Sequence, residues 1–136
     1  MSRSGYTDEC EGWDLIRWRG AVRSAICGKR GQQLLRDLLA ALDAMPVKRL
    51  IAHELEQEGE VCALGALGRV RHLDLNMLDP DDAEGVANTF NIAPALAREI
   101  VFANDERAWG KETPEERWAR VRKWVVQQIK EETCPT

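Results

Sequence analysis

The sequence has no long hydrophobic run. None of its apolar stretches approaches the roughly 20 residues that a membrane-spanning helix requires. The polar first residues also lack the hydrophobic core of a secretory signal peptide. We therefore expect a cytoplasmic protein that does not enter a membrane.

Cysteine and histidine, the usual ligands of transition metals, are scarce. The four cysteines are widely spaced and form no Cys-x-x-Cys pair, which disfavours zinc ribbons and thiol redox motifs and favours a reducing compartment. They are Cys10, Cys27, Cys62 and Cys134.

The two histidines, His53 and His72, do not belong to a metal-binding motif. His53-Glu54 does not begin a metalloprotease motif, because Gln57 stands where that motif has its second histidine. The glycines also lack the spacing of a phosphate-binding loop. We therefore predict neither a metal site nor a cofactor.

The residues that are present fit one globular domain. The chain has 136 residues, 44% of them hydrophobic and 31% charged, which is enough to bury a core and too apolar for a disordered protein. Helical spacing predominates, so we predict a mainly α fold: a compact bundle of about five helices, with at most one small β-hairpin before the central helix. We expect a flexible lead-in (1–12), one helical domain (13–132) and a short tail (133–136).

Local start and stop signals divide the first half of this domain. The apolar spacing predicts a helix over 13–27, with Gly28 as its C-cap, and a second over 32–44, which Pro46 stops. Residues 49–62 favour a small hairpin with its turn at Glu58-Gly59.

The segment from Glu60 to Arg71 is the least charged run and has the smallest side chains. Small side chains allow close backbone approach, so we predict that this segment forms the packed centre, with a helix over 63–72.

The second half of the domain has stronger capping signals. Asp79 as an N-cap and Pro80 at the first helical position predict a helix that ends at Asn91. A further helix is expected to begin near Pro94 and to fray at Asn104-Asp105, with Trp109 and Gly110 in the next loop. The capping box in Thr113-Pro114-Glu115-Glu116 predicts that the last helix starts at Pro114.

Tryptophan and arginine, the residues that dominate interface energetics, point to two candidate binding surfaces. On the first helix, an outer face of Trp13 and Arg17 is flanked by further basic residues. On the last helix, Trp124 lies on the flank beside Arg120, where we expect it to be exposed. The predicted binding surface comprises Trp13, Arg17, Arg19, Arg23, Lys29, Arg30, Arg120 and Trp124.

Two other kinds of site can be constructed from the sequence. The helices on either side of Asn91 resemble a helix-turn-helix pattern, but the second opens with Ala93-Pro94-Ala95-Leu96, without basic residues for a DNA groove. Cys62 precedes a helix N-terminus, which lowers a thiol pKa, and His53 could face it across the hairpin. The alternative for Cys62 is a buried cysteine that packs as a small hydrophobe.

The sequence resembles small uncharacterised bacterial and phage or prophage proteins. The resemblance rests on three short motifs: Val61-Cys62-Ala63-Leu64-Gly65-Ala66-Leu67, Asn104-Asp105 and Thr113-Pro114-Glu115-Glu116-Arg117. The stretch from Gly28-Lys29-Arg30-Gly31-Gln32 to Met45-Pro46 is similar to phage proteins as well. The resemblance implies a small accessory protein of a mobile element, with no catalytic residues to carry over.

We therefore hypothesise a non-enzymatic protein that binds a host protein or protein complex, as an anti-defence or inhibitory factor would. The alternatives are nucleic-acid binding through the basic first helix or the helix-turn-helix pattern, and a cysteine hydrolase that uses Cys62 and His53.

Overall fold

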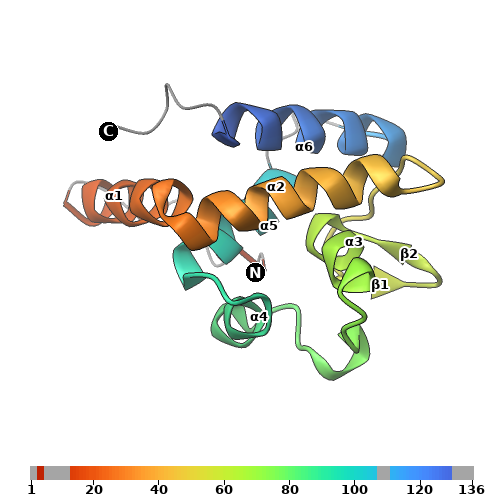
Figure 1. The fold of residues 1–136 in the computed structure, drawn as a ribbon, viewed down its shortest axis with the longest axis horizontal. Helices are drawn as coiled ribbons and strands as arrows, with labels where there is room; N and C mark the ends of the chain where they lie inside the picture. Colours follow the sequence, from red (N-terminus) through yellow and green to blue (C-terminus); the bar gives the residue numbers. More distant parts are fainter. Residues whose placement is uncertain (1–2, 5–12, 107–110, 130–136) are drawn as a thin grey trace.

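The computed structural model describes residues 3–4, 13–106 and 111–129 (Figure 1). Within these ranges the chain forms six α-helices and one two-stranded hairpin, so the predicted mainly α fold is confirmed. None of the helices in these ranges has the length and apolar character that crossing a membrane requires. The helices are α1 (Trp13–Cys27), α2 (Lys29–Ala44), α3 (Ala63–Val70), α4 (Ala83–Phe90), α5 (Pro94–Asp105) and α6 (Pro114–Ile129). The hairpin pairs β1 (Glu56–Gln57) with β2 (Glu60–Val61), and a short 3-10 helix, η1 (Leu75–Met77), precedes α4.

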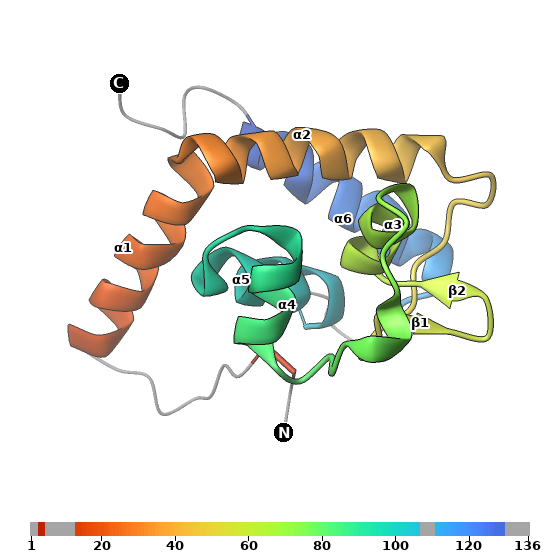
Figure 2. The same ribbon diagram turned by 60° about the horizontal axis from the view of Figure 1, so that its bottom comes forward.

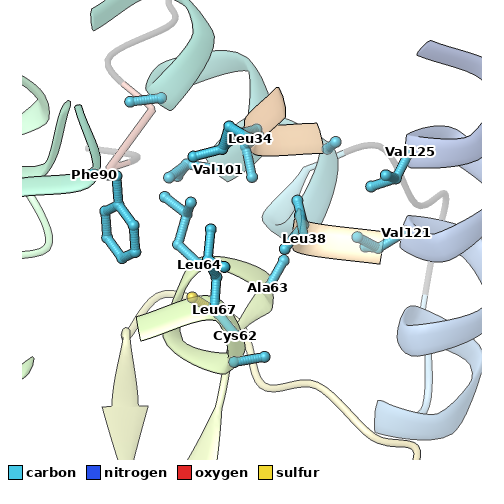
Figure 3. Packing of buried hydrophobic residues seen from close by; sticks show 14 of the residues in the cluster. Leu34, Leu38, Cys62, Ala63, Leu64, Leu67, Phe90, Val101, Val121 and Val125 are labelled. Carbon is cyan, nitrogen blue, oxygen red and sulfur yellow. The ribbon is translucent and has the colours of Figure 1, made fainter. Parts of the chain in front are cut away.

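Helix α5 is enclosed by the other helices. It contacts α1, α3, α4 and α6, and Figure 2 shows it behind α4 and below α2. Pro94 is its one exposed residue, and its buried positions include the neighbours Ile100 and Val101, so it is buried on more than one side. Side chains from α2, α3 and α6 meet in the same core (Figure 3).

The small-residue segment lies in the interior, as predicted. Every residue from Val61 to Gly68 is buried. A Cβ atom added to Gly65 would lie 2.0 Å from the carbonyl oxygen of Leu55 and 2.9 Å from the Cβ of Val61. The backbone of α3 therefore packs directly on Leu55, just before the hairpin, and on Val61 of β2. The helix itself ends at Val70, two residues earlier than predicted.

The predicted hairpin is present but short. Glu58 and Gly59 both have positive φ, 51° and 83°, as a two-residue turn matched to the twist of a hairpin requires. Glu56 pairs with Val61, and Gln57 with Glu60. Residues 49–55 are outside the strands, although the N–H of Ile51 donates to the carbonyl of Val61 at 2.9 Å.

Several predicted helix boundaries in the second half are confirmed. Thr113 and Glu116 exchange two hydrogen bonds of 3.1 Å in the capping box at the start of α6. Asn91 ends α4 in the left-handed conformation, with φ 57° and ψ 50°. Helix α5 begins at Pro94, but Asn104 and Asp105 are still helical and do not fray.

The predicted start of α4 is wrong. The side chain of Asp79 accepts a hydrogen bond from the N–H of Asp81 in a local turn, at 2.9 Å. Asp82 is the N-cap instead, and it accepts from the N–H of Gly85 at 3.1 Å. The start of α2 also differs, because it begins at Lys29, with Gly28 as its N-cap.

The structure describes two residues of the predicted lead-in (1–12), and both are buried. Arg3 is 5% exposed and Ser4 is fully buried. The other lead-in residues, the loop residues Trp109 and Gly110, and the predicted tail lie outside the described residues.

Gly65→Ala is expected to lower the free energy of unfolding by about 1–3 kcal/mol, because the new methyl group would overlap the backbone of Leu55. Gly20→Ala is the matched control. No atom lies within 4 Å of a Cβ at this helical position, so the substitution should raise stability by about 0.5–1 kcal/mol. Urea denaturation of both variants measures the difference, and equal stability would contradict the close packing.

Candidate functional site

The outer side of α1 is an exposed mixture of apolar and basic side chains. We call it the α1 face: Ile16, Arg17, Arg19, Gly20 and Arg23 are all exposed, and Ile16 is 61% exposed. The opposite side of the helix packs inward, as its apolar spacing predicted, through buried Ile26 and half-buried Val22 and Ala25.

The aromatic residues of α1 do not lie on the described part of this face. Trp18 is half-buried, with the guanidinium carbon of Arg98 5.8 Å from its ring centre. Trp13 begins α1, but its side chain lies outside the described set. The α1 face is therefore defined by its isoleucine and arginines.

The angle between α1 and α2 is fixed at Gly31 and Gln32. A Cβ on Gly31 would lie 1.8 Å from the carbonyl oxygen of Ala25, so the first turn of α2 touches the backbone of α1. The side-chain amide of Gln32 donates to the carbonyls of Ile26, at 2.8 Å, and Gln128, at 3.1 Å. These contacts hold α1 where it forms one edge of the molecule in Figure 2.

The predicted basic residues at the start of α2 are exposed. Lys29 and Arg30 follow the α1 face along the chain. Arg30 donates to the side-chain oxygen of Asn91 at 3.2 Å, which links α2 to the end of α4. Lys29 and Arg30 therefore lie next to the end of α1, and Arg30 already forms a hydrogen bond with Asn91.

The predicted surface on the last helix is wrong. Trp124 is only 6% exposed and belongs to the core. Arg120 is half-buried, with Nε 2.7 Å from Glu112 and Nη2 3.1 Å from the carbonyl of Asn104. It also donates to the carbonyl of Ala103. Arg120 therefore holds α6 against α5, and Trp124 is part of the core and not an exposed aromatic residue.

The helix-turn-helix interpretation does not fit the structure. Its second helix would be α5, which must present a polar face to a DNA groove. Helix α5 instead lies among α1, α3, α4 and α6, with Pro94 as its one exposed residue. The turn at Asn91 is present, but the helix after it is enclosed.

Cys62 and His53 both belong to one polar cluster, but they do not act as a pair in it. Cys62 is 1% exposed, and its sulfur caps α3 by accepting from the N–H of Gly65 at 3.4 Å. Its other described polar contact is Nη1 of Arg3 at 3.7 Å. The imidazole of His53 is 71% exposed, with Nδ1 3.8 Å from a carboxylate oxygen of Asp105.

The carboxylate of Asp105 is the centre of the cluster. Arg3 donates to both of its oxygens, from Nε at 2.5 Å and from Nη2 at 2.8 Å, and the two side chains are 2% and 1% exposed. The backbone N–H of His53 and the side-chain amide of Asn104 donate to the same carboxylate, at 3.1 and 2.8 Å. We call Cys62, Asn104, Asp105 and the N–H of His53 the Arg3 socket.

Asn104 connects the socket to the start of α3. Its side-chain oxygen accepts from the N–H of Ala63 at 3.1 Å, and its amide donates to the carbonyl of Ile51 at 2.9 Å. Ala63 is the first residue of α3, so this bond pairs an N–H that has no partner inside the helix. Every polar atom of the Asn104 side chain is therefore used.

The electrostatics of the socket favour the charged forms of Arg3 and Asp105. Burial acts to raise the pKa of Asp105, but the hydrogen bonds and charge of Arg3, with the Asn104 and His53 donors, hold that pKa below its ordinary value. Burial acts to lower the pKa of Arg3, whereas Cys62 and Asp105 raise it overall. The pair is a buried salt bridge with bidentate geometry.

Sequence reasoning missed Arg3 and Ser4. Ser4 is fully buried, and its hydroxyl donates a 2.5 Å hydrogen bond to the carboxylate of Glu106. One local signal for the socket existed: Asn104 continues the buried stripe of Ala97 and Ile100 at helical spacing, where a polar residue needs a partner. The partners themselves come from distant segments, which spacing cannot identify.

The described cysteines differ in state. Cys62 is free, whereas Cys27 is disulfide-bonded. The disulfide does not fit the reducing compartment that we expected from the cysteine spacing. Among the residues that the structure describes, no three His, Cys, Asp or Glu side chains are grouped so that they could hold a metal ion.

Comparison with family models, curated proteins and solved structures found no match to this chain.

Asp105→Asn is expected to lower the free energy of unfolding by about 3 kcal/mol at neutral pH, because it leaves the charge of Arg3 buried without its partner. The folded pKa of Asp105 is lowered, so its contribution is complete above the ordinary aspartate value of about 3.9 and disappears as the pH falls through the folded pKa. The difference between wild type and variant should therefore shrink on acidification. Chemical denaturation between pH 7 and pH 3 measures it.

Asp43→Asn is the control for this experiment. Asp43 forms an ion pair with Arg122 at 2.6 Å, and its pKa is also lowered, first by the hydrogen bond from Arg122. This pair is exposed, so its removal should change stability far less. A loss as large as that of Asp105→Asn would show that burial of the Arg3 pair is not the cause.

Trp124→Ala is expected to destabilise the protein by about 3–5 kcal/mol, because the side chain is in the core. The measurement is the midpoint of thermal unfolding with the near-ultraviolet circular dichroism of the variant. A variant that folds as stably as the wild type would support the surface role that the sequence suggested.

Proposed function

We propose that this protein binds another protein through the α1 face and acts by covering part of that partner's surface, without catalysis. In its fuller form the proposal is an accessory or anti-defence factor of a phage or mobile element, whose partner is a host protein or complex. The observation that carries the proposal is the exposed Ile16 among Arg17, Arg19 and Arg23 on a helix of fixed orientation.

The arginines of the α1 face are available for a partner. In the described part of the chain, Arg17, Arg19 and Arg23 form no salt bridge, in contrast to Arg117, Arg120 and Arg122 of α6. Arginine side chains are enriched at the energetic centres of interfaces. Their guanidinium groups can each bind a carboxylate through two parallel hydrogen bonds.

The chemistry of the α1 face selects a type of partner. Three positive charges within two turns require an acidic surface, and Ile16 requires an apolar recess within it. The rigid contact of Gly31 with α1 supports this role, because a preorganised helix loses little conformational entropy on binding.

Ile16→Asp is expected to abolish binding while the fold stays intact, because it removes the apolar contact and adds a charge that repels an acidic partner. Val47→Asp is the matched control, since Val47 is 59% exposed and lies after α2, away from α1 in sequence. A partner captured from the producing or infected cell should bind wild type and Val47→Asp but not Ile16→Asp. Calorimetry with the purified partner measures each affinity.

Two results would reject the proposal. One is a partner that binds Ile16→Asp and the charge-reversed double variant Arg17→Glu, Arg23→Glu as tightly as wild type. The other is tight binding of a nucleic acid in a gel shift, with an affinity that falls steeply with salt, which would assign the arginines to phosphates.

A further inference from the structure

The side chain of Arg3 lies in the protein as a ligand lies in a binding site. Its guanidinium binds Asp105 through Nε and Nη2 and contacts the sulfur of Cys62 through Nη1. These contacts join residues 102 and 59 positions apart in the sequence. Three nitrogens of the guanidinium fork therefore face acceptors supplied by the folded domain.

The acceptors of the socket are held in place by bonds that do not involve Arg3. The carboxylate of Asp105 receives hydrogen bonds from Asn104 and from the N–H of His53. Asn104 is itself fixed by the start of α3 and by the carbonyl of Ile51. The sulfur of Cys62 is fixed by its bond from the N–H of Gly65. The acceptors of the socket are therefore positioned by contacts within the rest of the domain.

The molecule has a hollow next to Arg3. It lies between α4 and α5 and is lined by Arg3 and Arg98 together with Pro80, Ala83, Val86, Ala97 and Val101. Apart from the two arginines, these side chains are apolar. An arginine from a peptide would place its aliphatic atoms where those of Arg3 now lie, beside these apolar residues, while its guanidinium enters the socket.

We propose that the Arg3 socket is a recognition site for the guanidinium of a peptide arginine, and that Arg3 is the resident ligand of the free protein. An arginine from another polypeptide takes the same position when it displaces Arg3. The two carboxylate oxygens of Asp105 favour a planar guanidinium over the ammonium of lysine, because an ammonium cannot donate two parallel hydrogen bonds. Because Arg3 contacts Cys62, the same exchange controls access to that thiol. The socket is separate from the α1 face and is tested independently of it.

The test uses the full chain with Arg3→Ala, which empties the socket. The melting temperature of this variant is expected to rise with increasing N-acetyl-arginine amide, because a ligand that binds the folded state stabilises it by mass action. N-acetyl-lysine amide at the same concentration is the matched control and should give a much smaller shift. The double variant Arg3→Ala, Asp105→Asn should respond to neither compound.

The alkylation rate of Cys62 is a second measurement, and it reports access to the thiol separately from the melting temperature. Iodoacetamide labelling, followed at Cys62 by mass spectrometry under native conditions, should be faster in Arg3→Ala than in wild type. N-acetyl-arginine amide should return the rate toward that of wild type, and N-acetyl-lysine amide should not. A rate that no compound changes would overturn the proposal.

If Arg3→Ala does not fold, the same measurement can be made on Arg3→Lys. Lysine retains the positive charge but offers no fork, so N-acetyl-arginine amide should still raise the melting temperature of Arg3→Lys. Refolding of Arg3→Ala by the same compound would support the site as well. If neither variant responds to N-acetyl-arginine amide, or if both respond equally to the lysine compound, the socket is not a guanidinium site.

Discussion

Helix α3 begins in the interior, and the polar groups at its start must find acceptors there. Asn104 accepts from Ala63, the first residue of the helix, while the sulfur of Cys62 accepts from Gly65. The same Asn104 side chain donates to Ile51 and to Asp105. One buried amide thus joins the start of α3, the loop before the hairpin and the end of α5. The small side chains of α3 permit this burial, because bulkier ones would keep its backbone away from the hairpin.

The two candidate sites depend on different parts of this framework. The Arg3 socket is built on the polar contacts of Asn104 and Asp105 at the end of α5. The α1 face depends on Gly31 and Gln32, which set the direction of α1 against α2. Because these groups share no hydrogen bond, a change in one site should leave the other intact, which allows their roles to be separated by substitution.

The parts of the fold that the sequence predicted are those determined by local interactions. The capping box at Thr113, the left-handed residue Asn91 and the turn at Glu58-Gly59 each act within a few residues of themselves. Asp79 was a wrong choice of N-cap because Asp82 has the same chemistry three residues later, and local rules do not choose between them.

The site residues were harder to predict, because their environment is set by distant contacts. The flanking position of Trp124 beside Arg120 on the helix predicts an exposed side chain, yet the structure buries it in the core. Arg3 stood in a polar segment without periodicity, and its partner is 102 residues away. By contrast, Arg17, Arg19 and Arg23 were placed correctly, since an exposed helix face follows from helical spacing alone.

The chemistry of the buried pair favours a role beyond stability. A well-packed apolar side chain in place of a buried ion pair often leaves a protein equally stable or more stable, so stability alone does not require arginine and aspartate here. The proposed role in recognition supplies a reason for the pair, because the two carboxylate oxygens match the parallel N–H groups of a guanidinium. Arg3 donates to Asp105, and Ser4 donates to Glu106, both at the end of α5. A guanidinium from another polypeptide would meet the same acceptors if Arg3 left them.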